Sequence, residues 1–79
     1  MPADSDVDAA VAELIAELDR ERSLTRRRMY EVSLTHLGED ECSDLEGKWA
    51  IPLPVLARFR ERRPAGAKWN VDEETWVLQ

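Results

Sequence analysis

The sequence predicts an α+β protein: a single small domain over residues 1–79, with two or three helices and a small antiparallel sheet or C-terminal hairpin. Three observations lead to this prediction. The length of 79 residues suits one domain with a small core. Apolar residues recur at helical spacing near the N-terminus, and apolar and polar residues alternate near the C-terminus.

Composition is that of an ordinary globular domain. The chain is 43% apolar and 35% charged, so we expect disorder only in residues 1–6. No stretch approaches the roughly 20 apolar residues of a membrane span. Acids at Asp4, Asp6 and Asp8 stand where a secretory signal carries basic and apolar residues. Cys42 is the only cysteine, which excludes an internal disulfide and fits a reducing compartment, so we expect a cytoplasmic protein.

The first helix is predicted at residues 7–22, where Ser5 or Asp6 is placed to cap it. Its apolar face consists of Val7, Val11, Leu14, Ile15 and Leu18. Such a face packs either on its own domain or on a second copy of the chain. A domain this small gains stability from an interface, so a homodimer through residues 7–22 is one predicted assembly.

Residues 25–37 fit two interpretations. As a helix, the segment is capped by Thr25 and ended by Gly38. As a strand, the segment places Tyr30, Val32 and Leu34 on one face and Met29, Glu31 and Ser33 on the other. The cap and the glycine favour the helix.

The segment after Gly38 is predicted to be an acidic loop over residues 39–46, followed by a short extended piece at residues 48–51. Pro52 and Pro54 keep the residues before them out of helical geometry. Pro54 suits the first position of a second firm helix that runs to about Arg63. Val55, Leu56 and Phe59 form the narrow apolar face of that helix.

The C-terminal segment is predicted to be a β-hairpin. Trp69 and Val71 alternate with polar residues, residues 72–74 turn, and Trp76 and Leu78 return on the same face. Large aromatics bury much area in a small domain, so the three tryptophans are predicted to build the core, with an interface role as the alternative.

Catalysis and metal binding have little support. His36 and Cys42 flank a predicted turn and supply only two soft ligands, whereas a structural zinc site needs four. The acidic residues 39–46 lack the spacing and glycine of a calcium loop. We therefore expect no enzyme activity, no metal and no cofactor.

Charge is unevenly distributed along the chain. Residues 1–19 carry a net charge of −6, residues 20–68 carry +3, and residues 69–79 carry −3. The basic residues that are candidates for phosphate contacts are Arg26, Arg27, Arg28, Lys48, Arg58, Arg60, Arg62 and Arg63. On a helical wheel, Arg58 and Arg62 lie on one side of the apolar face and Arg60 on the other, so they do not form one stripe.

One stretch carries a family resemblance. Gly47-Lys48-Trp49-Ala50-Ile51-Pro52, followed by Leu56 and Phe59 and then by Arg62-Arg63-Pro64, resembles the wing strand and closing helix of excisionase-type winged-helix domains. Leu24-Thr25 resembles the start of the first helix in that family. The resemblance implies a small DNA-binding accessory of the kind that phages and integrating elements encode.

Two functions follow from these patterns. The first is a small acidic regulator or inhibitor, of phage or mobile-element type, that binds a protein, including one that itself binds nucleic acid; some anti-CRISPR proteins act in this way. The predicted protein-binding acids are Asp8, Glu13, Glu17, Glu21, Glu39, Asp40 and Glu41, with Trp49, Trp69 and Trp76 as interface aromatics. The second is a DNA-binding accessory or transcriptional regulator that uses the basic residues named above, although the net charge of −6 disfavours it.

Overall fold

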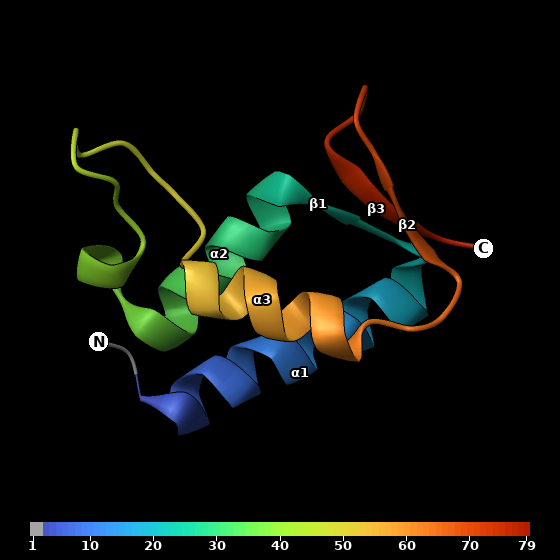
Figure 1. Cartoon of the computed structure of the whole chain (residues 1–79), viewed down its shortest axis with the longest axis horizontal. Helices are drawn as coiled ribbons and strands as arrows, with labels where there is room; N and C mark the ends of the chain where they lie inside the picture. The colour runs from blue at the N-terminus through green and yellow to red at the C-terminus, as the bar shows by residue number, and fades with distance from the viewer. Residues whose placement is uncertain (1–2) are drawn as a thin grey trace.

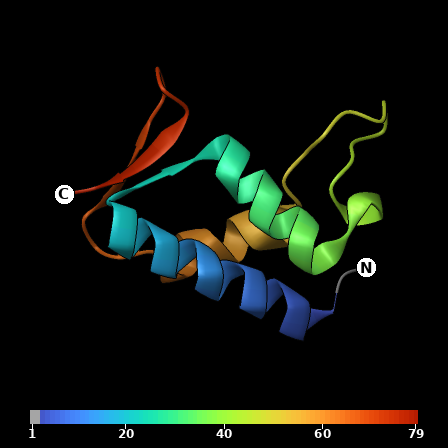
Figure 2. The same cartoon turned by 180° about the vertical axis from the view of Figure 1, so that it is seen from behind.

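A computed structural model describes residues 3–79, in which three helices and three strands form a small α+β domain (Figures 1 and 2). The predicted fold class is therefore confirmed. In chain order the elements are α1 (Asp4–Glu21), β1 (Ser23–Thr25), α2 (Arg26–Leu37), the 3-10 turn η1 (Glu39–Glu41), α3 (Leu53–Arg62), β2 (Ala67–Asn70) and β3 (Thr75–Leu78).

Helix α1 begins earlier than residue 7, at Asp4, and it ends where Arg22 adopts a left-handed conformation with φ 64°. Its N-cap is Ala3, whose side chain makes no capping hydrogen bond. The predicted capping role of Ser5 or Asp6 is therefore wrong, because both lie within the first turn. Of the residues expected to be disordered, 4–6 are helical, and residues 1–2 lie outside the described part of the chain.

Helix α2 confirms the helical interpretation of residues 25–37. The Thr25 hydroxyl accepts a hydrogen bond from the Arg28 backbone N–H at 3.0 Å. At the other end Gly38, with φ 85°, donates its N–H to the Leu34 carbonyl at 2.9 Å. Both expected boundary signals are thus used, and the strand alternative is wrong for residues 26–37.

Residues 38–50 form a projecting segment that we call the acidic lobe (Figure 1). After η1, it makes a small hairpin in which Ser43 pairs with Trp49. The Asp44 side chain accepts hydrogen bonds from the backbone N–H groups of Glu46 at 2.8 Å and Lys48 at 2.9 Å. The expected loop with a turn is present, and its tip is held by these bonds.

Helix α3 starts one position before the predicted Pro54 and ends at Arg62 rather than Arg63. Pro52 is its cap, and Pro54 lies in the first turn. Leu53, which we expected outside the helix, is its first residue. Proline has no backbone N–H, and the N–H groups of the first turn have no acceptor within the helix. Pro54 is therefore tolerated at this position.

The sheet is antiparallel with strand order β1-β3-β2. The predicted hairpin is present: Trp69 is directly opposite Trp76, although Val71 lies in the exposed turn rather than in a strand. Strand β1 was not predicted. It pairs with β3, which places Leu24 opposite Trp76 on the face of the sheet that meets the core.

The core lies between α1, α2 and α3, with the sheet at one end of the long axis and the acidic lobe at the other (Figures 1 and 2). Most of the apolar face of α1 lies inside it, since Val7, Val11, Leu14 and Leu18 are at most 1% exposed. These four residues pack on their own domain, whereas Ile15 is only half-buried, and a homodimer through residues 7–22 stays a prediction. No helix within residues 3–79 has the length and apolarity needed to cross a membrane.

Candidate functional site

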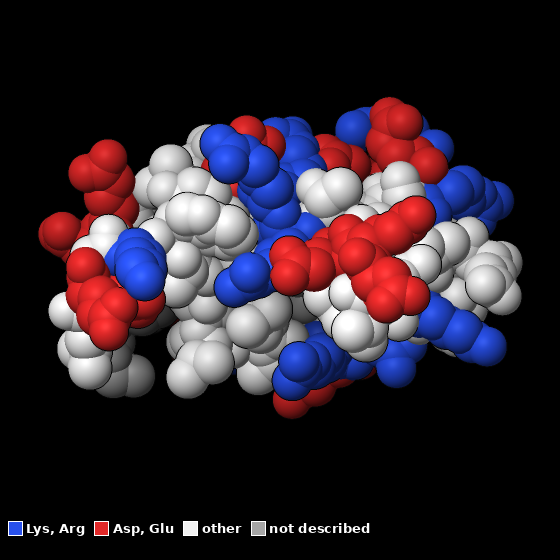
Figure 3. Space-filling view, turned by 90° about the horizontal axis from the view of Figure 1, so that it is seen from above, with Lys and Arg blue, Asp and Glu red and all other residues white. Residues whose placement is uncertain are grey.

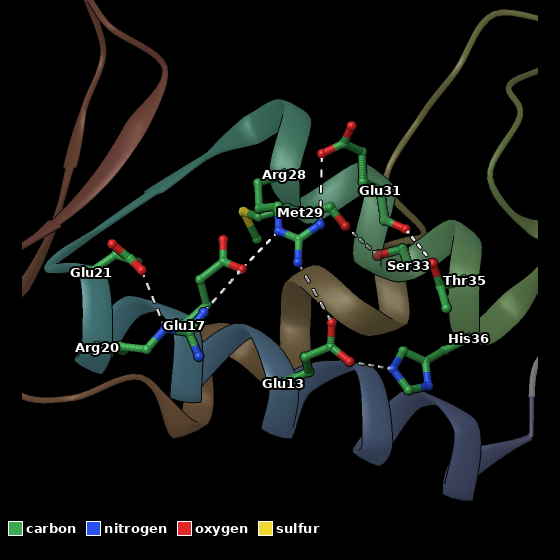
Figure 4. A network of polar contacts seen from close by, with 10 residues as sticks. All are labelled: Glu13, Glu17, Arg20, Glu21, Arg28, Met29, Glu31, Ser33, Thr35 and His36. Carbon is green, nitrogen blue, oxygen red and sulfur yellow. Dashed lines mark hydrogen bonds and ion pairs between the residues drawn. The ribbon is translucent and has the colours of Figure 1, made fainter.

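The acids of α1 are bonded to α2 (Figure 4). Glu17 Oε1 accepts a hydrogen bond from Arg28 Nε at 2.7 Å, and the Glu17 side chain is only 12% exposed. Glu13 Oε1 lies 3.0 Å from His36 Nε2, and its other oxygen lies 4.0 Å from Arg28. The hydrogen bond to Glu17 raises the pKa of the Arg28 guanidinium. Glu13 and Glu17, predicted to contact a partner, thus join two helices of the domain itself.

Asp8 is bonded to α3 in the same way. Its Oδ1 accepts hydrogen bonds from Arg58 Nη1 at 2.7 Å and from Arg62 Nη1 at 3.0 Å. The bond to Arg58 is the main reason that the pKa of the Asp8 carboxyl lies below its ordinary value. Arg58 and Arg62 lie on one side of the helix, as the wheel predicts, but both are engaged in an internal contact with Asp8, and Arg58 also lies 4.0 Å from Asp4.

Three other basic residues that were candidates for phosphate contacts also have partners within the domain. The Arg26 guanidinium lies 4.8 Å from the centre of the Trp49 ring and 3.9 Å from a Glu74 oxygen. Arg63 Nη1 donates to the Ala67 carbonyl at 2.6 Å, and Lys48 pairs with the exposed Glu46 at 3.4 Å.

Arg27 and Arg60 have no carboxylate partner within residues 3–79. On the face seen from above, acidic and basic side chains are interspersed, and no continuous basic patch covers it (Figure 3).

The acidic lobe presents the most exposed large apolar side chain of the described residues. Leu45 is fully exposed at the tip of the small hairpin, between Asp44 and Glu46. Glu39 and Asp40 are exposed in η1 of the same lobe and have no ion pair within residues 3–79. The sequence interpretation missed Leu45, because a lone leucine among acids gives no periodic pattern.

The remaining predicted acids differ from these. Glu21 is exposed at the end of α1 and pairs with its neighbour Arg20 at 3.2 Å. Glu41, in η1, is half-buried. Neither offers a free carboxylate comparable with those of Glu39 and Asp40.

The tryptophans occupy two separate places. Trp49, 38% exposed, contacts Tyr30 with ring centres 4.9 Å apart. Trp76 is half-buried and contacts both the buried Phe59, at 5.3 Å, and Trp69, at 5.5 Å. Trp69 is 39% exposed. The prediction that all three build the core therefore holds only in part, because Trp49 and Trp69 lie at the surface.

The two residues considered for catalysis, His36 and Cys42, have different surroundings. His36 contacts Glu13, and the Cys42 thiol is buried, which raises its pKa, with a smaller contribution from Glu41. Between residues 3 and 79, no group of three or more His, Cys, Asp or Glu side chains is arranged to hold a metal ion.

No protein-family model, curated protein or solved structure matches this chain. Its function must therefore be inferred from its surfaces. Two of them expose large apolar or aromatic side chains: the acidic lobe exposes Leu45, and the edge strand β2 of the sheet exposes Trp69.

Proposed function

We propose that this chain is a small non-enzymatic regulator or inhibitor, of the phage or mobile-element type, that acts by binding another protein through the acidic lobe. The observation that carries the proposal is the complete exposure of Leu45 at the tip of an ordered hairpin. Burying such a side chain in a partner contributes about 1.5–3 kcal/mol, which is the size of a binding hot spot.

The order of the tip supports this role. The side chain of Asp44 fixes the turn, Gly47 adopts φ 80°, and the Ala50 N–H donates to the Cys42 carbonyl at 2.9 Å. A tip held in this way loses little entropy when it binds.

The charges of the lobe indicate the chemistry of the partner. Glu39 and Asp40 offer carboxylates that no cation within residues 3–79 neutralises. An apolar pocket with a rim of Lys or Arg is complementary to this surface. Basic rims are typical of surfaces that bind nucleic acid, so the proposed partner includes nucleic-acid-binding proteins.

Affinity capture with matched variants tests the proposal. The tagged wild-type chain, Leu45→Ser and the control Val71→Ser are used to capture host proteins. Val71 is also an exposed apolar residue, but it lies in the turn at the opposite end of the molecule. We expect one protein to be retained by the wild type and by Val71→Ser and lost from Leu45→Ser. Equal retention by all three would refute a contact through the lobe.

A second candidate is the DNA-binding accessory, and the order of the elements favours it. Winged-helix domains have the same order of elements: a helix, a strand, two helices and a two-stranded hairpin, with β1 beside β3. In that comparison α3 would be the recognition helix and residues 71–74 the wing. The residues that resembled a wing strand, 47–51, instead lie in the connection before α3.

The charges disfavour this second candidate. The turn that would be the wing contains Asp72, Glu73 and Glu74, which repel phosphates, and Arg58 and Arg62 are bonded to Asp8. Duplex-DNA binding at about 50 mM and about 200 mM salt separates the two candidates. Micromolar binding that weakens steeply with salt would support the DNA-binding role, and no binding at low salt would exclude it.

A further inference from the structure

Trp69 lies at the surface and packs against another aromatic ring. It lies on the edge strand β2, directly opposite Trp76, and the two rings meet edge to face with their planes at 60°. Trp76 is in turn anchored against Phe59, which is completely buried. The outer ring is therefore supported from beneath while 39% of Trp69 remains in contact with solvent.

A hollow lies on each side of this ring. One of about 250 Å³ is lined by Arg60, Trp69 and Trp76. The other, of about 330 Å³, is lined by Lys68, Trp69, Asn70, Val77 and Gln79. Trp69 belongs to both, so its ring borders one hollow that contains Arg60 and another that contains Lys68.

The two cations are not engaged elsewhere. Neither Arg60 nor Lys68 has an ion pair within residues 3–79, unlike Arg58 and Arg62. The acids of the hairpin are in the turn at residues 72–74, beyond the last paired residues of the strands, Asn70 and Thr75. An exposed aromatic ring that borders two hollows, each lined by a cation without an ion pair, is complementary to a ligand that is planar and negatively charged.

We propose that this surface binds single-stranded nucleic acid, with one base stacked on Trp69 and the flanking phosphates on Arg60 and Lys68. Base stacking on an aromatic side chain, combined with cations along the backbone, is the general mode of sequence-tolerant single-strand binding. A duplex fits less well because its bases are stacked on one another and do not expose their faces. A cationic ligand is repelled by Arg60 and Lys68.

The experiment is fluorescence anisotropy with a labelled oligothymidylate of about 12 nucleotides, at about 50 mM and about 200 mM salt. Two ligands are compared with the single strand. One is the duplex formed by the same oligonucleotide and its complement, and the other is thymidine monophosphate. We expect the single strand to bind more tightly than either, with an affinity that falls as salt rises.

Variants test the assigned residues. Trp69→Leu keeps apolar bulk in the hairpin and removes the aromatic face, so binding should fall about tenfold, as expected for one stacked base. Arg60→Gln and Lys68→Gln should each weaken binding and reduce its salt dependence. The controls are Trp49→Leu, similarly exposed but elsewhere on the molecule, and Arg27→Gln; neither should change binding. A circular dichroism melt of each variant verifies that it is folded.

Several results would overturn this assignment. One is a folded Trp69→Leu variant that binds the single strand as well as the wild type does. Tighter binding of the duplex would assign the surface to double-stranded DNA instead. Thymidine monophosphate that binds as tightly as the oligonucleotide would reduce the site to one for free nucleotides. No binding of the single strand at low salt would rule out a nucleic-acid site on this surface.

Discussion

Replacing Leu14 with alanine tests the packing of α1 on its own domain. Leu14 is completely buried in the core between the three helices. Large-to-small substitutions of buried leucine cost about 2–5 kcal/mol, because apolar transfer energy is lost and a cavity remains. A 79-residue domain has a free energy of unfolding of about 4–12 kcal/mol in total. The substitution therefore removes a large part of the stability.

The change in melting temperature follows from the same numbers. In a domain of this size each kcal/mol corresponds to about 4–8 °C, so a loss of about 3 kcal/mol lowers Tm by about 12–24 °C. The assay is urea unfolding followed by circular dichroism, with a thermal melt in parallel. We expect the urea midpoint to fall while the slope m stays unchanged.

Leu45→Ala is the matched control, since the same atoms are removed from a side chain that is fully exposed. It should change stability by less than about 0.5 kcal/mol. A loss below about 1 kcal/mol for Leu14→Ala would refute the burial of this residue. A wild-type Tm that rises with protein concentration, and loses this dependence in Leu14→Ala, would place Leu14 between two chains instead.

Three further predictions follow from individual contacts. Because the pKa of Asp8 is lowered by Arg58, Asp8→Asn should be less stable than the wild type at neutral pH. The difference should begin to shrink as the pH falls below the ordinary carboxyl pKa of 3.8 and vanish below the lowered pKa of Asp8; a difference independent of pH would contradict the ion pair. Burial raises the pKa of the Cys42 thiol, so a thiol reagent at pH 8 should modify it far more slowly in the native protein than in urea, and equal rates would show that the thiol is accessible. A Cβ at Gly66 would lie 2.7 Å from the Gln79 carbonyl oxygen, so Gly66→Ala should cost about 1–3 kcal/mol in urea unfolding, and unchanged stability would show that the C-terminus yields.

The two proposed surfaces are independent of each other. The acidic lobe and the hairpin lie at opposite ends of the long axis, with the helical core between them (Figure 1). Leu45→Ser should therefore leave oligonucleotide binding unchanged, and Trp69→Leu should leave protein capture unchanged. Loss of one activity alone thus identifies which proposal fails.

Most of the secondary structure could be predicted because its signals are local. The spacing of Val7, Val11, Leu14 and Leu18 defines one face of α1 whatever it packs against. Thr25 and Gly38 act on hydrogen bonds within a few residues of themselves, so the bounds of α2 were predictable too.

The missed strand has no such signal. Strand β1 is three residues long, too short for any alternation to be recognised, and it is stabilised by β3, with Ser23 opposite Val77. The pairing joins two segments that are far apart in the sequence, since Ser23 and Val77 are 54 positions apart. It exists because the turn at Arg22 brings the chain beside the hairpin, which no pattern within residues 23–25 records.

The candidate site also separates what local sequence patterns predict from what packing between distant segments decides. The sequence by itself determined which residues are charged or aromatic, and that Arg58 and Arg62 share one side of a helix. Only the tertiary structure decided that these arginines neutralise Asp8, that Glu17 holds Arg28, and that Leu45 and Trp69 remain exposed. The physical reason is that periodicity defines the faces of each element, whereas ion pairing and exposure depend on which faces meet, and that is decided by packing between distant segments.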